Sequence, residues 1–123
     1  IGQSRNNRQY QLRTLLDLGT NISFGSDWPV TSHKPLEAIF IPVLRKVPGS
    51  SGEAWSATEA ITLEESLTAY TANTAYQLFD ELEIGKLEAG MRANFVILDK
   101  SPFESYELNI KSVWIDGQSV KVS

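Results

Sequence analysis

A helix that leads within a few residues into a strand constrains the fold of this chain more than any other feature. Apolar residues at helical spacing predict a helix from Ser4 to Leu18, and Gly19 ends it. The apolar residues within Asn21 to Gly25 then predict a short strand. Because parallel strands need long, usually helical connections, this order favours an α/β fold with a sheet that the helix covers.

A carboxylate, Asp27, stands just after this strand and before Pro29. In barrels of parallel strands and helices, side chains at the carboxyl ends of the strands face the active-site mouth, so Asp27 is a candidate catalytic residue. An Asp that merely caps the following turn is an equally good interpretation of the local pattern. The single histidine, His33, lies on the loop that follows, and we expect it to be solvated or to cap rather than to bind a metal.

Composition limits the classes of partner. The 123 residues are 41% hydrophobic, which suits one compact domain with a core. The net charge of -4 with scattered basic residues argues against nucleic-acid and anionic-membrane partners. No apolar run approaches the roughly 20 residues that span a bilayer, and the absence of cysteine excludes a disulfide framework and a thiolate metal site. We expect a cytoplasmic protein, and the first residue, Ile1, suggests a fragment or a processed chain.

Two further helices flank a long loop. Apolar residues at helical spacing predict a helix from Pro35 to Val47. The polar stretch 48–60 reads as a loop, either a lid or a connector. Thr62 and Glu65 have the spacing of a capping box, which predicts that a third helix begins there and runs to Leu78. We interpret its aromatic side chains as packing residues rather than as a binding site; they are Tyr70, Tyr76 and, just beyond it, Phe79.

The pattern changes from helical to extended after Gly85. The apolar run from Asn94 to Asp99 predicts a strand buried on both faces. A second strand, Ser112 to Ile115, meets Asp116-Gly117 and then the stretch from Gln118 to Val122. Asp-Gly accepts the positive φ angles of a type I′ turn, so the chain is predicted to end in an antiparallel hairpin.

Five segments in this order resemble the carboxyl-terminal part of metal-dependent amidohydrolases, in the amidohydrolase 3 group that includes N-substituted formamide deformylases. They are Gly25-Ser26-Asp27-Trp28-Pro29, the helix from Pro35 to Arg45, the run from Leu63 to Ala75, Ile84 to Gly90, and Ala93 to Asp99. The resemblance covers nearly the whole chain. One departure is Gly90-Met91-Arg92-Ala93-Asn94, where the family tends to have Gly-Lys-x-Ala-Asp.

The resemblance implies an architecture and a role for Asp27. Family members combine a metal-bearing (β/α)8 barrel with a small β-sandwich built from both chain ends. Residues 1–80 would be the last strand and flanking helices of the barrel, and residues 81–123 would be antiparallel strands of the sandwich. Asp27 would end the eighth barrel strand, as a metal ligand or as the general base that takes a proton from a metal-activated water.

The implied reaction is hydrolysis of a carbon-nitrogen bond other than a peptide bond, in a small-molecule amide or a related substrate. A divalent metal, with zinc as the expected ion, would be bound by the full-length protein. The fragment alone is expected to bind none and to be inactive, because a hydrolytic zinc site needs about three protein ligands. Its unpartnered apolar faces favour a homo-oligomer. The alternative is a non-catalytic interaction or regulatory module that retains the amidohydrolase tail.

Overall fold

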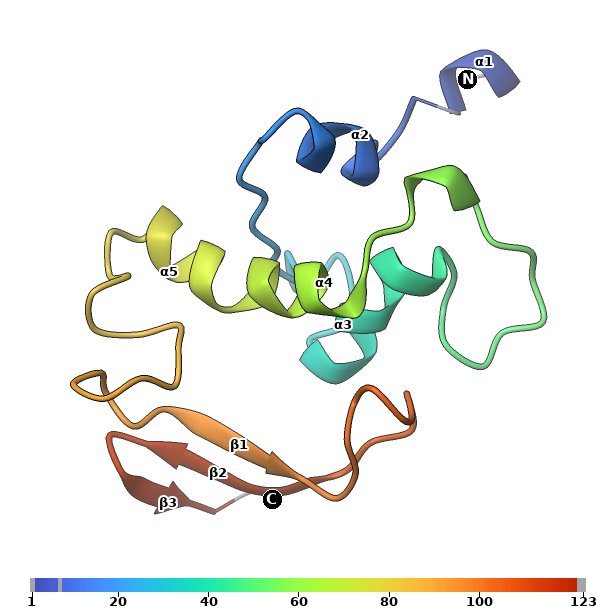
Figure 1. Ribbon diagram of the computed structural model, residues 1–123. Helices are drawn as coiled ribbons and strands as arrows, with labels where there is room; N and C mark the ends of the chain where they lie inside the picture. Colours follow the sequence, from blue (N-terminus) through green and yellow to red (C-terminus); the bar gives the residue numbers. More distant parts are fainter. Residues whose placement is uncertain (1, 7, 122–123) are drawn as a thin grey trace.

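The computed structural model describes residues 2–6 and 8–121, which form a group of short helices above an antiparallel sheet (Figure 1). In chain order the elements are α1 (Gln3–Asn6), α2 (Leu12–Asp17), α3 (Pro35–Leu44), the 3-10 helix η1 (Ala57–Glu59), α4 (Leu63–Tyr70), α5 (Ala72–Gln77), β1 (Phe95–Leu98), β2 (Ile110–Ile115) and β3 (Gln118–Val120). Helices and strands are therefore segregated along the chain. None of the helices in the described ranges is long and apolar enough to cross a membrane.

The N-terminal helix is broken, contrary to the prediction of one helix from Ser4 to Leu18. α1 ends at Asn6 and α2 begins at Leu12. Between them Tyr10 has a left-handed backbone with φ 51°, which a continuous right-handed helix cannot include. The predicted end at Gly19 is confirmed, because α2 stops at Asp17 and the Gly19 N–H donates to the carbonyl of Leu16 at 2.9 Å.

The predicted strand from Asn21 to Gly25 is also wrong for the described residues. A strand requires a neighbouring strand to exchange backbone hydrogen bonds with, and none lies beside this segment in the described part of the chain. Its backbone is bonded to the α4–α5 region instead, as when the Phe24 N–H donates to the carbonyl of Ala69 at 3.1 Å. The predicted parallel sheet is consequently not formed by these residues.

α3 confirms the predicted helix at Pro35, although it ends at Leu44 rather than Val47. Arg45 follows with φ 53°, a left-handed conformation that terminates the helix. Ile39 and Phe40 are 8% and 5% exposed and belong to the small core that α3 forms with α4. The loop predicted at 48–60 is confirmed, except for the single turn of η1.

The capping box is confirmed, but the helix that follows is divided in two. The Glu65 N–H donates to Thr62 Oγ1 at 3.1 Å, and the Thr62 N–H donates to the Glu65 carboxylate at 2.7 Å. At Thr71 the backbone turns to φ -121° and ψ -87°, which ends α4 and starts α5. The prediction of a single helix from Thr62 to Leu78 is therefore wrong at Thr71. The pattern of side chains in the sequence does not indicate a break there.

The carboxyl-terminal hairpin is confirmed. β1 pairs with β2 and β2 with β3, all antiparallel, and Asp116 and Gly117 have φ of 51° and 75°, as a type I′ turn requires. Phe95 on β1 lies opposite Trp114 on β2, and their rings stack with centroids 5.5 Å apart. The predicted end of the last strand, Val122, lies outside the described residues.

Strand β1 is not buried on both faces, as its apolar run had predicted. Val96 and Ile97 are 49% and 45% exposed. An apolar strand is buried on both faces only when other layers cover both sides of its sheet, and the described residues do not supply them. Tyr76 and Phe79, which we expected to be packed, are likewise exposed, whereas Tyr70 packs on Phe24 with ring centroids 5.3 Å apart.

Two carboxylates fasten α2 to the other helices. The buried Glu59 of η1 accepts hydrogen bonds from Thr14, at 3.0 Å from its N–H and 2.6 Å from its hydroxyl. The Glu65 carboxylate of α4 accepts two hydrogen bonds from the Arg13 guanidinium, at 2.8 and 2.9 Å. The hydrogen bonds from Thr14 lower the pKa of the Glu59 carboxyl below its ordinary value of 4.5.

Glycine 85 packs the loop after α5 against the helix break. A Cβ added at Gly85 would lie 2.7 Å from the Cβ of Ala75 and 3.1 Å from the Cα of Ala72. These alanines are the small residues that allow the close approach. At Gly90, with nearly the same backbone angle, an added Cβ would meet nothing within 4 Å.

A comparison of Gly85 with Gly90 tests the effect of steric crowding at the break between α4 and α5. Gly85→Ala should lower the free energy of unfolding by about 1 to 3 kcal/mol more than Gly90→Ala, because overpacking adds to a backbone strain that both variants share. The two glycines have φ of 96° and 97°, so that strain is matched. Urea unfolding of both proteins measures the difference, and equal losses would show that the contact at Ala75 is not tight.

A second prediction concerns acid. Because the folded pKa of Glu59 is lowered, the unfolded state binds more protons, and stability rises with pH. The contribution of Glu59 should be fully present above its ordinary pKa of 4.5 and should be lost as pH falls through the lower folded value. Thr14→Val removes the hydroxyl donor, so its melting temperature should depend less on pH between about 7 and 3. The exposed Thr68→Val is the control, and an identical pH dependence in both variants would contradict the assignment.

Candidate functional site

The candidate catalytic residue lies in an exposed turn that is ordered by other groups. The Val30 N–H donates to the Asp27 carbonyl at 2.8 Å, the Trp28 N–H donates to Ser26 Oγ at 3.3 Å, and the Thr31 hydroxyl donates to the Ser26 carbonyl. Asp27 itself has a left-handed backbone with φ 49°. Among the described residues, no hydrogen bond or ion pair involves its carboxylate. The capping role that the local pattern also allowed is taken by the hydroxyl of Ser26.

The backbone that leads to this turn is held by the α4–α5 region. In addition to the bond from the Phe24 N–H to Ala69, the side-chain amide of Asn73 donates to the Ile22 carbonyl at 2.8 Å. The Thr74 hydroxyl lies 3.3 Å from the Phe24 carbonyl. Residues 22–24 are thereby fixed relative to a helix about 50 positions later in the chain. Sequence reasoning did not identify Asn73 or Thr74 as relevant to the site.

The described residues do not form a complete metal site around Asp27. Residues 2–6 and 8–121 contain no group of three or more His, Cys, Asp or Glu side chains placed to hold a metal ion. His33 is exposed on the loop beyond Asp27, as expected. Since a zinc site takes about three protein ligands, Asp27 fits as a single ligand and a complete set needs donors from outside these residues.

An apolar cavity of about 420 Å³ opens beside the segment that precedes Asp27. Phe24, Gly25 and Thr31 line it from the segment and the turn, and Trp55 lines it from the long loop. The Arg45 guanidinium lies 5.0 Å from the centroid of the Trp55 ring, and its Nε donates to the Trp55 carbonyl at 3.0 Å. The long loop is therefore anchored at its centre, by contacts that its polar sequence does not indicate.

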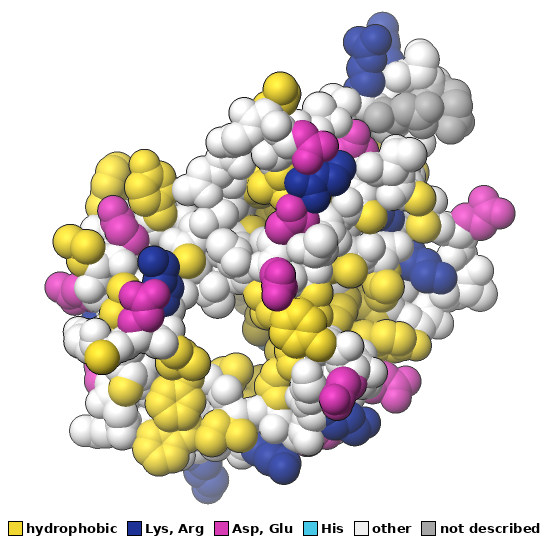
Figure 2. Space-filling model, viewed as in Figure 1, with side chains coloured by type: hydrophobic (Ala, Val, Ile, Leu, Met, Phe, Trp, Pro, Cys, Tyr) yellow, Lys and Arg dark blue, Asp and Glu magenta, His cyan; other side chains and the backbone are white. Residues whose placement is uncertain are grey.

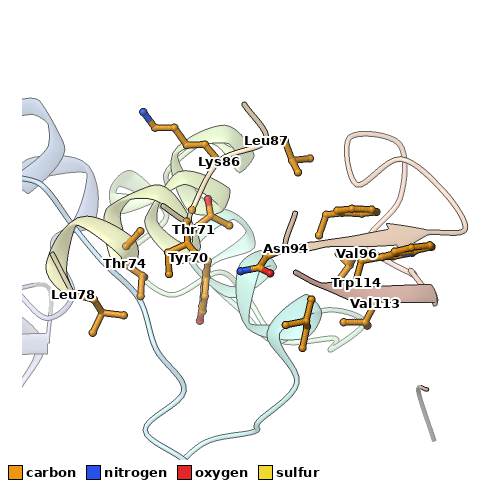
Figure 3. Close-up of a pocket in the computed structure, with 15 residues that line it drawn as sticks. Tyr70, Thr71, Thr74, Leu78, Lys86, Leu87, Asn94, Val96, Val113 and Trp114 are labelled. Carbon is orange, nitrogen blue, oxygen red and sulfur yellow. The ribbon is translucent and has the colours of Figure 1, made fainter. Parts of the chain in front are cut away.

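A larger hollow of about 700 Å³ separates α4 and α5 from the sheet. Figure 2 shows this opening with hydrophobic side chains along its rim, and Figure 3 shows its walls. Thr71, Thr74 and Leu78 line it from the helical side, and Val96 and Trp114 line it from the sheet. Among the described residues that line it, Lys86 is the only Lys, Arg, Asp or Glu. This surface is suited to apolar contact rather than to acid-base chemistry.

The comparisons with known proteins point to one family. The sequence profile of the Amidohydrolase family matches residues 1–121. The N-substituted formamide deformylase of Arthrobacter pascens is 34% identical over 113 residues, which are 88% of this chain and 20% of that protein. The Arabidopsis thaliana protein LONG AFTER FAR-RED 3 is 30% identical over 103 residues, 84% of this chain and 18% of that protein.

A solved structure supports the same fold. An amidohydrolase from Thermotoga maritima MSB8 superimposes with a TM-score of 0.71 at 24% identity, over 91% of this chain and 26% of that one. The chain spans about a fifth of the length of the two curated relatives, at 20% and 18%. The profile match over nearly every residue shows that the chain belongs to the amidohydrolase family.

Proposed function

We propose that this chain is the carboxyl-terminal part of a metal-dependent amidohydrolase that hydrolyses a non-peptide carbon-nitrogen bond, with Asp27 as general base or metal ligand. The observation that carries the proposal is that the chain belongs to the amidohydrolase family and that the Asp27 carboxylate is exposed and not used by its own turn. Its carboxylate lies exposed at the end of a fixed segment, and the turn around it is ordered by Ser26 and Thr31 instead. A carboxylate that is not used by its own turn is available to a substrate, a water or a metal.

The architecture we propose follows the division of the chain. Residues 1–80 would be the last strand and flanking helices of a (β/α)8 barrel, and residues 81–123 would contribute to a small β-sandwich. The segregation of helices before Gln77 and antiparallel strands after Phe95 supports this division. The segment at residues 22–24 would then find its missing strand neighbours in the rest of the barrel.

The chemistry assigns one task to Asp27. A divalent metal, zinc in our proposal, lowers the pKa of a bound water toward neutrality when it is present. The Asp27 carboxylate would accept the proton of the attacking water at an oxygen and return it to the nitrogen of the leaving amine. The substrate class we propose is a small N-substituted amide, which is supported by the name of the deformylase relative.

The first test replaces the carboxylate in the full-length protein. Asp27→Asn keeps the size of the side chain but removes the proton acceptor, so kcat should fall by on the order of 10²-fold or more on N-substituted amides. The melting temperature should change little, because the carboxylate makes no hydrogen bond within its turn. Asp17→Asn is the matched control, since Asp17 is a surface carboxylate paired with Arg13.

The kcat and melting temperature of Asp27→Asn separate the catalytic from the non-catalytic alternative. Unchanged kcat in Asp27→Asn with a lowered melting temperature would contradict the catalytic assignment and favour a non-catalytic module. The 123-residue chain alone serves as the negative control. It should bind no stoichiometric zinc and hydrolyse no amide, because residues 2–6 and 8–121 contain no group of three or more side chains placed to hold a metal ion. One equivalent of tightly bound zinc, lost on Asp27→Ala, would overturn that expectation.

We also propose that the isolated chain self-associates. Exposed apolar side chains occur on the helices, in the loops and on the sheet, and some of them line the hollow between the helices and the sheet (Figure 2). Ile39 and Phe40 of α3 are buried, although Ile41 of the same helix is exposed. Leu87, which lines the hollow, is 75% exposed. A patch of this kind is covered in stable proteins, and a second copy is the partner that a purified chain has available.

Light scattering tests this association. The chain should be a dimer or larger at micromolar concentration, and Val96→Lys, which places a charge on the open face of β1, should shift it toward the monomer. Ser51→Lys on the exposed loop adds the same charge elsewhere and should leave the association unchanged. A monomeric parent chain at high concentration would refute the proposal.

A further inference from the structure

We infer that Asn73 is a positioning residue for Asp27. Its side-chain amide, together with the Thr74 hydroxyl, holds the backbone that leads to the carboxylate. The inference rests on the catalytic role proposed for Asp27, and it adds a second group to the site from a helix distant in the sequence.

The contact between Asn73 and the segment is direct. Asn73 Nδ2 donates to the Ile22 carbonyl at 2.8 Å, in a partly buried position, although the two residues are 51 positions apart. Thr74 Oγ1 lies 2.9 Å from the Ala69 carbonyl and 3.3 Å from the Phe24 carbonyl. A hydroxyl has one proton, so it donates to one of these carbonyls at a time, and Asn73 provides the more constant bond to the segment.

The break at Thr71 makes these contacts possible. In a continuous helix the Ala69 carbonyl would accept the N–H four residues later, which belongs to Asn73. Because the chain turns at Thr71, the Ala69 carbonyl accepts instead from the Phe24 N–H at 3.1 Å. The helix thus gives up part of its own hydrogen bonding to hold a segment that has no strand beside it in the described residues.

The short distance along the chain transmits this constraint to the carboxylate. Gly25 and Ser26 separate Phe24 from Asp27, and the turn after them is closed by the bond from Val30 to the Asp27 carbonyl. A displacement of residues 22–24 would therefore displace the carboxylate. A shift of about 1 Å in a catalytic group can lower a rate by about 10²-fold, so loss of the anchor should lower turnover.

The test uses the full-length protein and two changes at one position. Asn73→Ala removes the donor, and the isosteric Asn73→Asp places a carboxylate oxygen against the Ile22 carbonyl. Both should lower kcat by about 10-fold or more, with the larger loss for Asn73→Asp and with KM changed little. Thr68→Val is the control, because Thr68 lies exposed on α4 and no hydrogen bond joins its side chain to residues 22–24.

A double variant distinguishes positioning from a general loss of structure. If Asn73 acts through Asp27, then Asn73→Ala should lower kcat no further in a protein that already carries Asp27→Asn. Losses that multiply in the double variant, or a kcat that falls equally in Thr68→Val, would overturn the inference. Loss of kcat in Asp27→Asn but not in Asn73→Ala would overturn it while leaving the proposed function intact, and unchanged kcat in Asp27→Asn would overturn both.

Thr74 keeps the inference testable if the Asn73 variants do not fold. Thr74→Val removes the hydroxyl near the Phe24 carbonyl, and Thr74→Ser restores it. The expected result is a lowered kcat in Thr74→Val and a recovery in Thr74→Ser at similar KM. Equal kcat in the two Thr74 variants would count against the anchor.

Discussion

The break between α4 and α5 determines how two other parts of the chain are held, residues 22–24 before Asp27 and the loop that leads to the sheet. On one side of it, the Ala69 carbonyl and the Asn73 amide bond to residues 22–24, which carry Asp27. On the other side, Gly85 fits against Ala72 and Ala75 and brings the chain toward the sheet. A single residue with irregular backbone angles, Thr71, therefore connects the candidate site to the path that leads into the hairpin.

Local chemistry explains which elements were predictable from the sequence. The capping box of Thr62 and Glu65, the helix start at Pro35 and the Asp116-Gly117 turn each depend on residues within a few positions of one another. Their hydrogen bonds and backbone preferences act whatever the rest of the chain does. Asp27 was singled out in the same way, from its place after an apolar segment and before Pro29, and from the order of segments typical of amidohydrolases.

The predictions that were wrong concern elements whose structure depends on partners distant in the sequence. The segment at residues 21–25 has the composition of a strand but lacks a neighbouring strand in the described residues. The strand that contains Val96 has the composition of a buried strand, but no layer covers Val96 in the described residues. The contact of Thr14 with Glu59 crosses 45 positions and leaves no local signal. The chain spans about a fifth of the length of two curated relatives, at 20% and 18%.

Asn73 shows how a local conflict in a sequence can be informative. Asparagine is a weak helix former, because its amide competes with the backbone for hydrogen bonds, and within a run from Thr62 to Leu78 it reads only as a mild defect. The structure uses that amide outside the helix, on the Ile22 carbonyl, and uses the interrupted helix for the same purpose at Ala69. A residue that is unfavourable for its own element but satisfied by a distant one carries information about tertiary structure. In this chain both such departures, the amide of Asn73 and the turn at Thr71, converge on the backbone that presents Asp27.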